Sequence, residues 1–380
     1  MKVSTKLLQG ALAVLATSQG EKKTVTLTPG ANALILTTMA PTGSTRASLL
    51  ANAEEDDIQA CALPAPMLAT LAGAAGVDIF EIRPDKSPTI VRAVAGASNT
   101  ALNIIEPTDH VLLDPATAPA ERTTFSLPLN VLAAALARVQ HAAASPAKTA
   151  TLAHTMIQFI VTPEGNLITA ALDGTRLSWM RVGIPDWDGP AVNLLFPQTR
   201  ALERLLALAP EAVAHVLVAG GKILVAVKAD GIMTEVVLNT AELSYPDWQS
   251  LLRQHDIKPA VIAVAKLKAL RDLFGKANTI CPTKKIGVKV MGAQLLIAAQ
   301  AEAVRHVDAI TLESVEGLAE GADFTMYTSP DSIREALDAV ANWTDAESVR
   351  LGFAAPNKPL IIGVPGYEYS SYVWSMVKEG

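Results

Sequence analysis

The sequence predicts an α+β protein that consists of three tandem domains of one architecture. Its 380 residues are too many for one ordinary hydrophobic core and suit two or three domains. Half of the residues are hydrophobic and 18% are charged, a balance typical of a well-packed chain. The same order of helices and strands recurs about every 130 residues, close to the common size of a domain. We therefore expect domains at 1–122, 123–253 and 254–380, with boundaries near "DPATAPAERT" (114–123) and "RQHDIKPA" (253–260).

A one-sided helix opens each of the three repeats. These helices are expected at 3–19, 129–144 and 263–277. In each of them apolar residues recur every three or four positions, which is the spacing of one helix face. The apolar stripes are Leu8, Ala11, Leu12 and Leu15 in the first helix, Leu129, Leu132, Leu136 and Val139 in the second, and Val264, Leu267, Leu270 and Phe274 in the third.

Strand-like segments follow each of these helices, at 24–38, 155–174 and 284–300. They are rich in β-branched residues and broken by a Gly-containing turn, so they are interpreted as hairpins. A second helix, entered through Pro or Ser, and a closing hairpin complete each repeat. Such a repeat has two explanations: an ancient duplication without functional meaning, or a function that requires three similar domains. The second helices are expected at 62–75, 196–210 and 329–341, and the closing turns at "RPDKSP" (83–88), "VAGGK" (218–222) and "APNKP" (355–359).

Residues for metal or covalent chemistry are sparse. Cys61 and Cys281 lie too far apart in the sequence for a CxxC metal site, and the six histidines are scattered. An enzyme is the main rival class, but the sequence has no GxSxG elbow, phosphate loop or GxGxxG motif. The acidic run around Asp56 and Asp57 is more typical of a solvated loop than of a metal site. We expect a protein without catalytic activity, metal or cofactor, in a reducing, cytoplasmic compartment.

The first twenty residues allow two interpretations. Lys2 and Lys6 before an apolar stretch imitate a secretory signal, which would make the protein a secreted or periplasmic multi-domain binding protein. Gln9 and Gly10 interrupt that stretch, however, and the apolar spacing favours an amphipathic first helix. No uninterrupted apolar run of about eighteen residues or more occurs elsewhere in the sequence, so we expect no membrane span.

Charge is distributed unevenly between the helices and the rest of the chain. The chain carries a net charge of −6, whereas the helical stretches together carry +5, so the remainder carries −11. The stretches counted are 3–19, 62–75, 129–148, 198–209, 263–277 and 330–341. Basic helices suit contact with a phosphate backbone, although a solvated helix face also carries Lys and Arg. No recognition motif accompanies them, so any contact with duplex DNA should be independent of base sequence. The candidate DNA-binding residues are Arg138, Lys148, Arg200, Arg204, Lys266, Lys268 and Arg271.

Three motifs lie in a characteristic order: "GNLITAALDGTRLSW" (165–179), "LSYPDWQSLL" (243–252) and "YVWSMVK" (372–378). Together with the three repeats, they resemble the bacterial DNA sliding clamp, the β subunit of DNA polymerase III. The resemblance implies a DNA polymerase processivity factor in which two chains close head to tail into a ring around duplex DNA. Such a homodimer has helices inside and sheets outside, and it tethers polymerase without making or breaking a bond. It also implies that edge strands of domain one pair with domain three of the other chain, with apolar contacts from Leu273 and Phe274.

The resemblance further implies a pocket between the second and third domains that accepts short peptides from polymerases, the clamp loader and other partners. Thr175, Ser250 and Ser375 stand where the family often has other residues, so the preferred peptide is open. By itself, the nearness of Asp173 to Arg176 is also explained by a salt-bridged turn. The implied pocket residues are Met156, Leu172, Gly174, Thr175, Arg176, Leu177, Pro246, Leu251, Val373, Ser375 and Met376.

Overall fold

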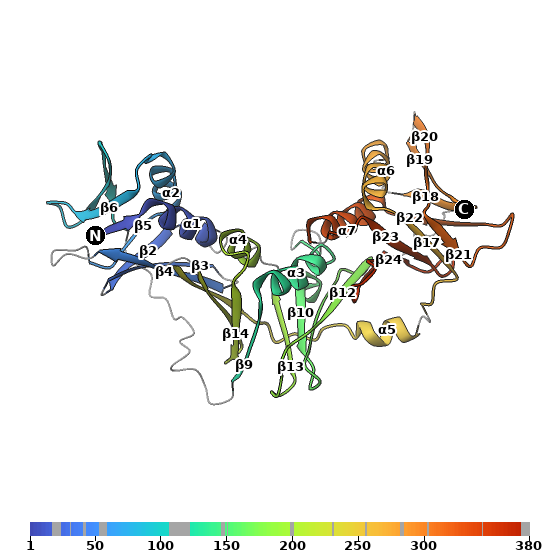
Figure 1. Cartoon of the computed structure of the whole chain (residues 1–380), viewed down its shortest axis with the longest axis horizontal. Helices are drawn as coiled ribbons and strands as arrows, with labels where there is room; N and C mark the ends of the chain where they lie inside the picture. The colour runs from blue at the N-terminus through green and yellow to red at the C-terminus, as the bar shows by residue number, and fades with distance from the viewer. Residues whose placement is uncertain are drawn as a thin grey trace.

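The protein forms a crescent whose chain ends lie at opposite horns (Figure 1). No helix among the described residues is both long and apolar enough to span a membrane. We name three parts of the chain by their residues: the N-terminal segment (1–105), the middle segment (122–254) and the C-terminal segment (257–373). The computed structural model describes residues 1–16, 24–30, 32–40, 43–52, 59–105, 122–145, 149, 151–197, 201–229, 232–254, 257–281, 285–301, 304–343 and 345–373.

The N-terminal segment places its first helix in the core. The apolar face of α1 is buried, with Leu8 and Leu15 fully inaccessible, as its spacing predicts. Gln9 on the edge of this face donates a hydrogen bond of 2.7 Å to the carbonyl of Ala72, so α1 is tied to α2. The elements are β1 (Lys2–Ser4), α1 (Thr5–Leu15), β2 (Thr24–Gly30), β3 (Ala33–Ala40), β4 (Gly43–Asn52), β5 (Cys61–Pro64), α2 (Ala65–Ala74), β6 (Ile79–Pro84), β7 (Ile90–Ala95) and β8 (Ser98–Asn103).

The middle segment repeats this order and adds one helix that the sequence patterns did not predict. This helix, α5, contains most of the "YPDWQSLL" motif and lies on the side of the sheets away from the other helices (Figure 1). The elements are β9 (Thr123–Pro128), α3 (Leu129–Gln140), the 3-10 helix η3 (Leu152–Thr155), β10 (Met156–Val161), β11 (Asn166–Leu172), β12 (Arg176–Gly183), β13 (Val192–Pro197), α4 (Ala201–Leu208), β14 (Val213–Ala219), β15 (Lys222–Ala229), β16 (Ile232–Asn239) and α5 (Trp248–Gln254).

The C-terminal segment differs from expectation at its first helix. We expected a helix from 263, but Val264 lies in a strand because it pairs with Arg350 of β23. Buried and more accessible side chains alternate along this strand, which is the period of two expected of a strand and not of a helix. The elements are β17 (Val261–Lys266), α6 (Leu267–Ile280), β18 (Ile286–Met291), β19 (Gln294–Ala301), β20 (Val304–Thr311), β21 (Ser314–Glu316), β22 (Asp323–Thr328), α7 (Pro330–Trp343), β23 (Ser348–Phe353), β24 (Leu360–Gly363) and β25 (Tyr369–Val373).

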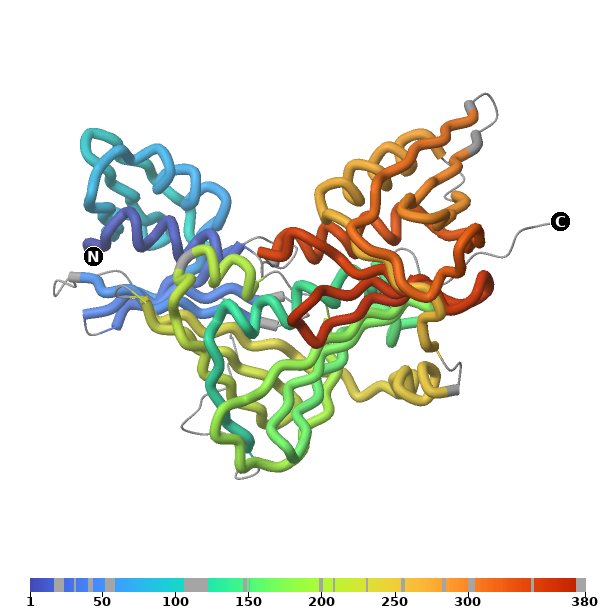
Figure 2. The backbone as a smooth tube through the Cα atoms, turned by 45° about the vertical axis from the view of Figure 1, so that its right-hand side comes forward, coloured from blue at the N-terminus to red at the C-terminus, as the bar shows by residue number. Residues whose placement is uncertain are grey.

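Two pairs of antiparallel strands join the three segments. Strand β4 pairs with β16 between the first two segments, and β12 pairs with β25 between the last two. The sheets therefore run through both joins, as the tube in Figure 2 shows. The helices pack in the order α2, α1, α4, α3, α7 and α6 and cover the concave side of the crescent (Figure 1).

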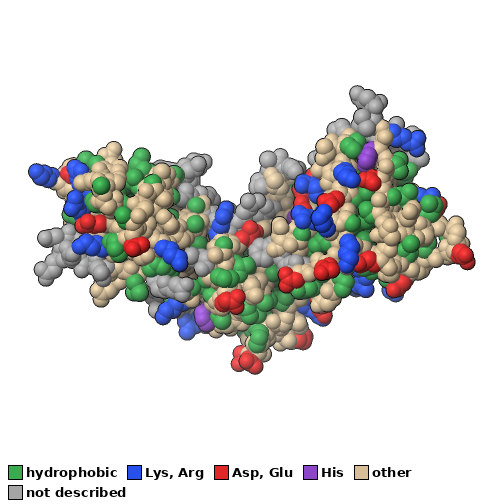
Figure 3. Space-filling model, turned by 45° about the horizontal axis from the view of Figure 1, so that its top comes forward, with side chains coloured by type: hydrophobic (Ala, Val, Ile, Leu, Met, Phe, Trp, Pro, Cys, Tyr) green, Lys and Arg blue, Asp and Glu red, His purple; other side chains and the backbone are tan. Residues whose placement is uncertain are grey.

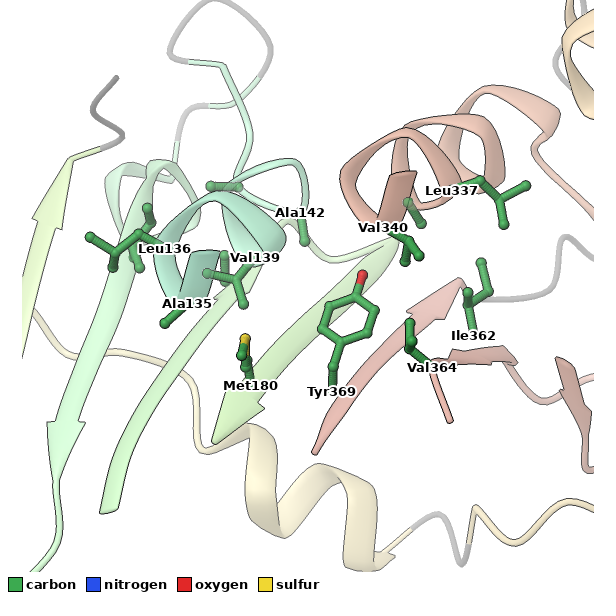
Figure 4. Close-up of a cluster of buried hydrophobic side chains, with 14 of the residues drawn as sticks. Ala135, Leu136, Val139, Ala142, Met180, Leu337, Val340, Ile362, Val364 and Tyr369 are labelled. Atoms are coloured by element: carbon green, nitrogen blue, oxygen red, sulfur yellow. The ribbon is translucent and has the colours of Figure 1, made fainter. Parts of the chain in front are cut away.

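A mixed core fills the join between the middle and C-terminal segments. Figure 4 shows Val139, Met180, Val340 and Tyr369 converging between α3, α7 and the paired strands β12 and β25. Apolar side chains from both segments therefore form one continuous core at this join.

A small polar network lies in the same join. His141 follows α3, and its Nε2 lies 3.0 Å from the Ser178 hydroxyl and 3.4 Å from the Ser371 hydroxyl. The two serines, which are opposite each other in the strand register, are 2.8 Å apart. Burial lowers the pKa of His141 from 6.5 to about 3, so the imidazole is neutral in the folded protein at physiological pH.

We predict that His141 makes the fold sensitive to acid. Below pH 6.5 the unfolded chain binds a proton that the folded chain does not, so His141 lowers the free energy of unfolding as the pH falls from 6.5 towards 3. The loss is about 1.4 kcal/mol per pH unit at most. Urea unfolding at pH 7.5, 6 and 5 should show a shallower pH dependence for His141→Asn than for the parent. Parallel pH curves for the two proteins would contradict this assignment.

Candidate functional site

The turn between β11 and β12 is built around one carboxylate. Asp173 Oδ1 accepts hydrogen bonds from the backbone amides of Thr175 (2.9 Å) and Arg176 (3.1 Å) and from the Thr175 hydroxyl (2.7 Å). Its other oxygen accepts one from Arg176 Nε at 2.8 Å. Gly174 between them has a φ of 87°, which a residue with a Cβ rarely adopts. The local sequence Asp-Gly-Thr-Arg therefore fixes the shape of this turn.

Arg176 points to the helical side of the sheet, where it links two segments. It forms an ion pair with Glu335 of α7 as well as with Asp173. Burial alone would lower the pKa of Arg176, but the two carboxylates outweigh it and raise the pKa. We expected Arg176 to share one wall with Leu177, but alternation along β12 puts the two side chains on opposite faces. Arg176 thus holds α7 against the turn.

The opposite face of the same strands carries an aromatic cluster beneath α5. Trp248 is its centre: the ring stacks on Trp179 with 6.0 Å between centroids, and Nε1 donates a hydrogen bond of 2.8 Å to Gln158 Oε1. Burial also raises the pKa of the Tyr245 hydroxyl in this cluster. We call the following residues the outer cluster: Ile168, Ala170, Leu172, Leu177, Trp179, Tyr245, Trp248, Leu252 and Tyr372.

The predicted pocket residues divide into a buried floor and an accessible rim. Leu172 and Leu177 belong to the outer cluster and are 9% and 1% exposed. Met156 is also buried and, by strand alternation, shares the face of Gln158. Val373 is buried on the other face, opposite Arg176 in the register, so it is not part of this cluster. The rim consists of the exposed Gly174 and Thr175 and the half-buried Pro246 and Leu251, whereas Ser375 and Met376 lie outside the described residues.

Sequence patterns missed the residues that cover this floor. Tyr245, Trp248 and Leu252 are spaced by three and four positions, which is helical spacing that could have revealed α5. Leu152 of η3 was also missed: it is 55% exposed, and its neighbour His154 lies 3.7 Å from where a Cβ on Gly174 would be. These residues extend the accessible rim beyond the predicted set.

The candidate DNA-binding residues are mostly, but not all, on the helical side. Arg204 on α4 and Lys266, Lys268 and Arg271 at the start of α6 are exposed. The last three line a hollow of about 730 Å³ together with Asp272 and Glu347. Figure 3, which brings the helical side forward, shows basic and acidic side chains intermingled over the C-terminal half of the crescent. Lys148 and Arg200 lie outside the described residues.

Arg138 is a correction to that set. It is only 2% exposed, although it lies in the last turn of α3. Its guanidinium lies 4.6 Å from the ring centre of Tyr367, and its Nη1 lies 3.4 Å from Met180 Sδ. Tyr367 belongs to the C-terminal segment, and Met180 belongs to the core shared by the middle and C-terminal segments. Arg138 therefore supports this join and does not face a ligand on the concave side.

Leu273 and Phe274 are a second correction. Both are buried in the core under α6, at 2% and 0% exposure, so they are not surface contacts for a second chain. Phe274 already belonged to the apolar stripe that predicted this helix, and the core is where that stripe points. The candidate contacts for a second chain are instead edge strands. Strands β8 and β20 each end a sheet, and Val307 on β20 is 57% exposed.

The described residues include no candidate metal site. No group of three His, Cys, Asp or Glu side chains there could hold an ion. Cys61 is buried, and burial raises the pKa of its thiol to about 11, so it is a poor nucleophile.

We predict that Trp248 holds α5 on the sheet. Trp248→Ala should lower the free energy of unfolding by about 3–5 kcal/mol because it removes a buried ring. Trp248→Phe keeps most of the ring contacts but leaves the Gln158 amide oxygen without its donor, which should cost about 1–3 kcal/mol. Urea unfolding of the parent and both variants measures this order. Two variants as stable as the parent would show that α5 does not depend on this contact.

The fold of the chain matches that of solved structures, although no sequence comparison finds a relative. No family model and no curated protein sequence matches the chain. Solved structures do match over its whole length. DNA polymerase III β subunits of Thermotoga maritima and Pseudomonas aeruginosa superpose with TM-scores of 0.83 and 0.80 at 14% and 16% identity. The first match covers 100% of this chain and 99% of the other, and the second covers 99% of each.

A third match is the DNA polymerase sliding clamp of Bacillus subtilis, with a TM-score of 0.79 and 15% identity over 100% of this chain and 99% of the other. The predicted α+β architecture of three tandem, clamp-like units is thereby confirmed. The chain has the fold of the bacterial DNA polymerase III β subunits.

Proposed function

We propose that the protein is a sliding clamp that encircles duplex DNA and tethers a polymerase to it. The observation that carries this proposal is the exposure of Lys266, Lys268 and Arg271 on the concave, helical side of a full-length clamp fold. Exposed cations on a concave surface suit contact with a phosphate backbone that passes through the ring without readout of base sequence. No bond needs to be made or broken, so the function requires no catalytic group, metal or cofactor.

The two ends of the crescent support the proposal that the ring closes. Strand β8 lies at the end of one sheet and β20 at the end of another, and these sheets occupy opposite horns (Figure 1). Such unpaired edges bind further strands readily. We therefore propose a homodimer in which β8 of one chain pairs with β20 of the other, head to tail.

The rim of the outer cluster is the proposed site for partner peptides from polymerase, the clamp loader and other proteins. Pro246 and Leu251 are apolar and partly accessible, and Thr175 is exposed, whereas Leu172 and Leu177 of the outer cluster are buried. An extended peptide with one or two large apolar anchors fits such a surface better than a charged one.

We also propose that the three segments are domains bounded at 1–122, 123–253 and 254–380, and that the protein acts on replicating DNA in the cytoplasm.

Retention on circular DNA tests the ring. We predict that the dimer, loaded by its clamp loader, stays on a closed DNA circle through gel filtration and slides off after the circle is cut, because the link is topological. Val307→Lys puts a charge on the exposed edge of β20 and should lower both the dimer fraction in sedimentation and the retention on circles. A parent protein that sediments as one chain, or that is retained equally on linear DNA, would refute the proposed function.

A peptide titration tests the rim. We predict that Leu251→Asp weakens binding of an apolar clamp-binding peptide from the cognate polymerase at least tenfold, because the peptide would bury an unpaired carboxylate. Leu50→Asp is the matched control, since Leu50 is 65% exposed on β4 of another segment. Thermal unfolding of both variants checks that the fold is intact. Equal peptide affinity in the parent and Leu251→Asp would remove the rim from the site.

A further inference from the structure

The exposed cations at the start of α6 are all engaged by carboxylates of the same chain. Lys268 Nζ lies 2.9 Å from Asp272 Oδ2, one turn further along the helix. Arg271 Nη2 lies 2.7 Å from Asp338 Oδ1 on the neighbouring helix α7. Asp338 also reaches Arg334 at 3.6 Å. Arg334 also lies 3.4 Å from Asp331, so these three basic side chains are paired with three carboxylates on the helical side.

The same arrangement surrounds the hollow at the beginning of α6. Lys266 Nζ lies 2.9 Å from Glu313 Oε1 and 3.3 Å from Glu347 Oε2. Of these carboxylates, Glu347 lines the hollow, as does Asp272 beside Lys268. The surface that would meet a phosphate backbone therefore presents alternating charges, and its net charge in this region is close to zero.

A contribution to folding stability does not account for the Lys268–Asp272 pair. Lys268 is 89% exposed and Asp272 59%, and ion pairs so accessible to water contribute little to folding. Their field matters more to a ligand than to the fold. A carboxylate beside each cation repels an approaching phosphate and must be separated from its partner before the cation can neutralise that phosphate.

We propose that Asp272 and Asp338 hold Lys268 and Arg271 away from DNA phosphates and so keep the contact between the ring and the duplex weak. This inference rests on the proposed function. The two carboxylates compete with DNA phosphates for the same two cations, which would otherwise bind the backbone more strongly. A ring with this lining can move along DNA because few counterions are released, and few must return, at each step.

Removing the competitors tests the proposal. Asp272→Asn with Asp338→Asn keeps the side-chain shapes but removes both charges. The affinity of the dimer for a linear duplex should rise at least about threefold at low salt. The slope of log affinity against log salt should steepen by about two, since each phosphate neutralised contributes close to 0.9. Fluorescence anisotropy of a labelled duplex across a salt series measures both quantities, and sedimentation confirms that the dimer persists.

A matched control separates local charge from net charge. Asp323→Asn with Glu368→Gln changes the net charge equally and breaks two ion pairs, with Lys289 and Arg181. Both cations lie on sheet faces turned away from the helices, because Lys289 alternates with buried valines and Arg181 shares the face of Trp179. This control should leave affinity and slope near the parent values.

Two outcomes would overturn the inference: an equal rise in the test and control variants, which reduces it to net charge, or no rise in the test variant. Either result would leave the proposed function intact if the parent is still retained on circular DNA. Loss of that retention in the parent would reject the function itself.

Discussion

Antiparallel pairing across the two joins is the constraint on which the rest of the structure depends. Because β4 pairs with β16 and β12 with β25, the sheets continue from one segment to the next and cannot rotate independently. A period of two then fixes which side chains face the helices and which face outward. In β12 this sends Ser178 and Met180 to the core beneath α3 and Trp179 to the outer cluster.

Charged side chains secure both joins, but on opposite faces of the sheets. At the first join Arg46 of β4 forms an ion pair with Glu235 of β16, on the face opposite the buried Val236. At the second join Arg176 of β12 pairs with Glu335 on the helical face. Burial makes such pairs costly to break, because each leaves an uncompensated charge. The segments are therefore held in one relative orientation by register and by charge together.

The charge pattern of the chain gains a physical explanation from the fold. A net charge of −6 is unusual for a protein proposed to surround DNA. In the structure, the exposed cations of α6 on the helical side are matched by nearby carboxylates. A surface of this kind attracts a backbone only weakly, which suits the proposed ring, because enclosure would hold DNA without strong affinity.

The sequence by itself determined the repeat, the amphipathic helices and most hairpin turns, because these depend on spacing within a few residues of the chain. It also located the Asp-Gly-Thr-Arg turn and part of the floor beneath α5. Only the tertiary structure decided the environment of Arg138, Leu273 and Phe274, since burial depends on what packs against a helix from elsewhere. Likewise, alternation along β12 puts Arg176 and Leu177 on opposite faces, but only the packing of α7 and α5 against those faces gives them two different partners.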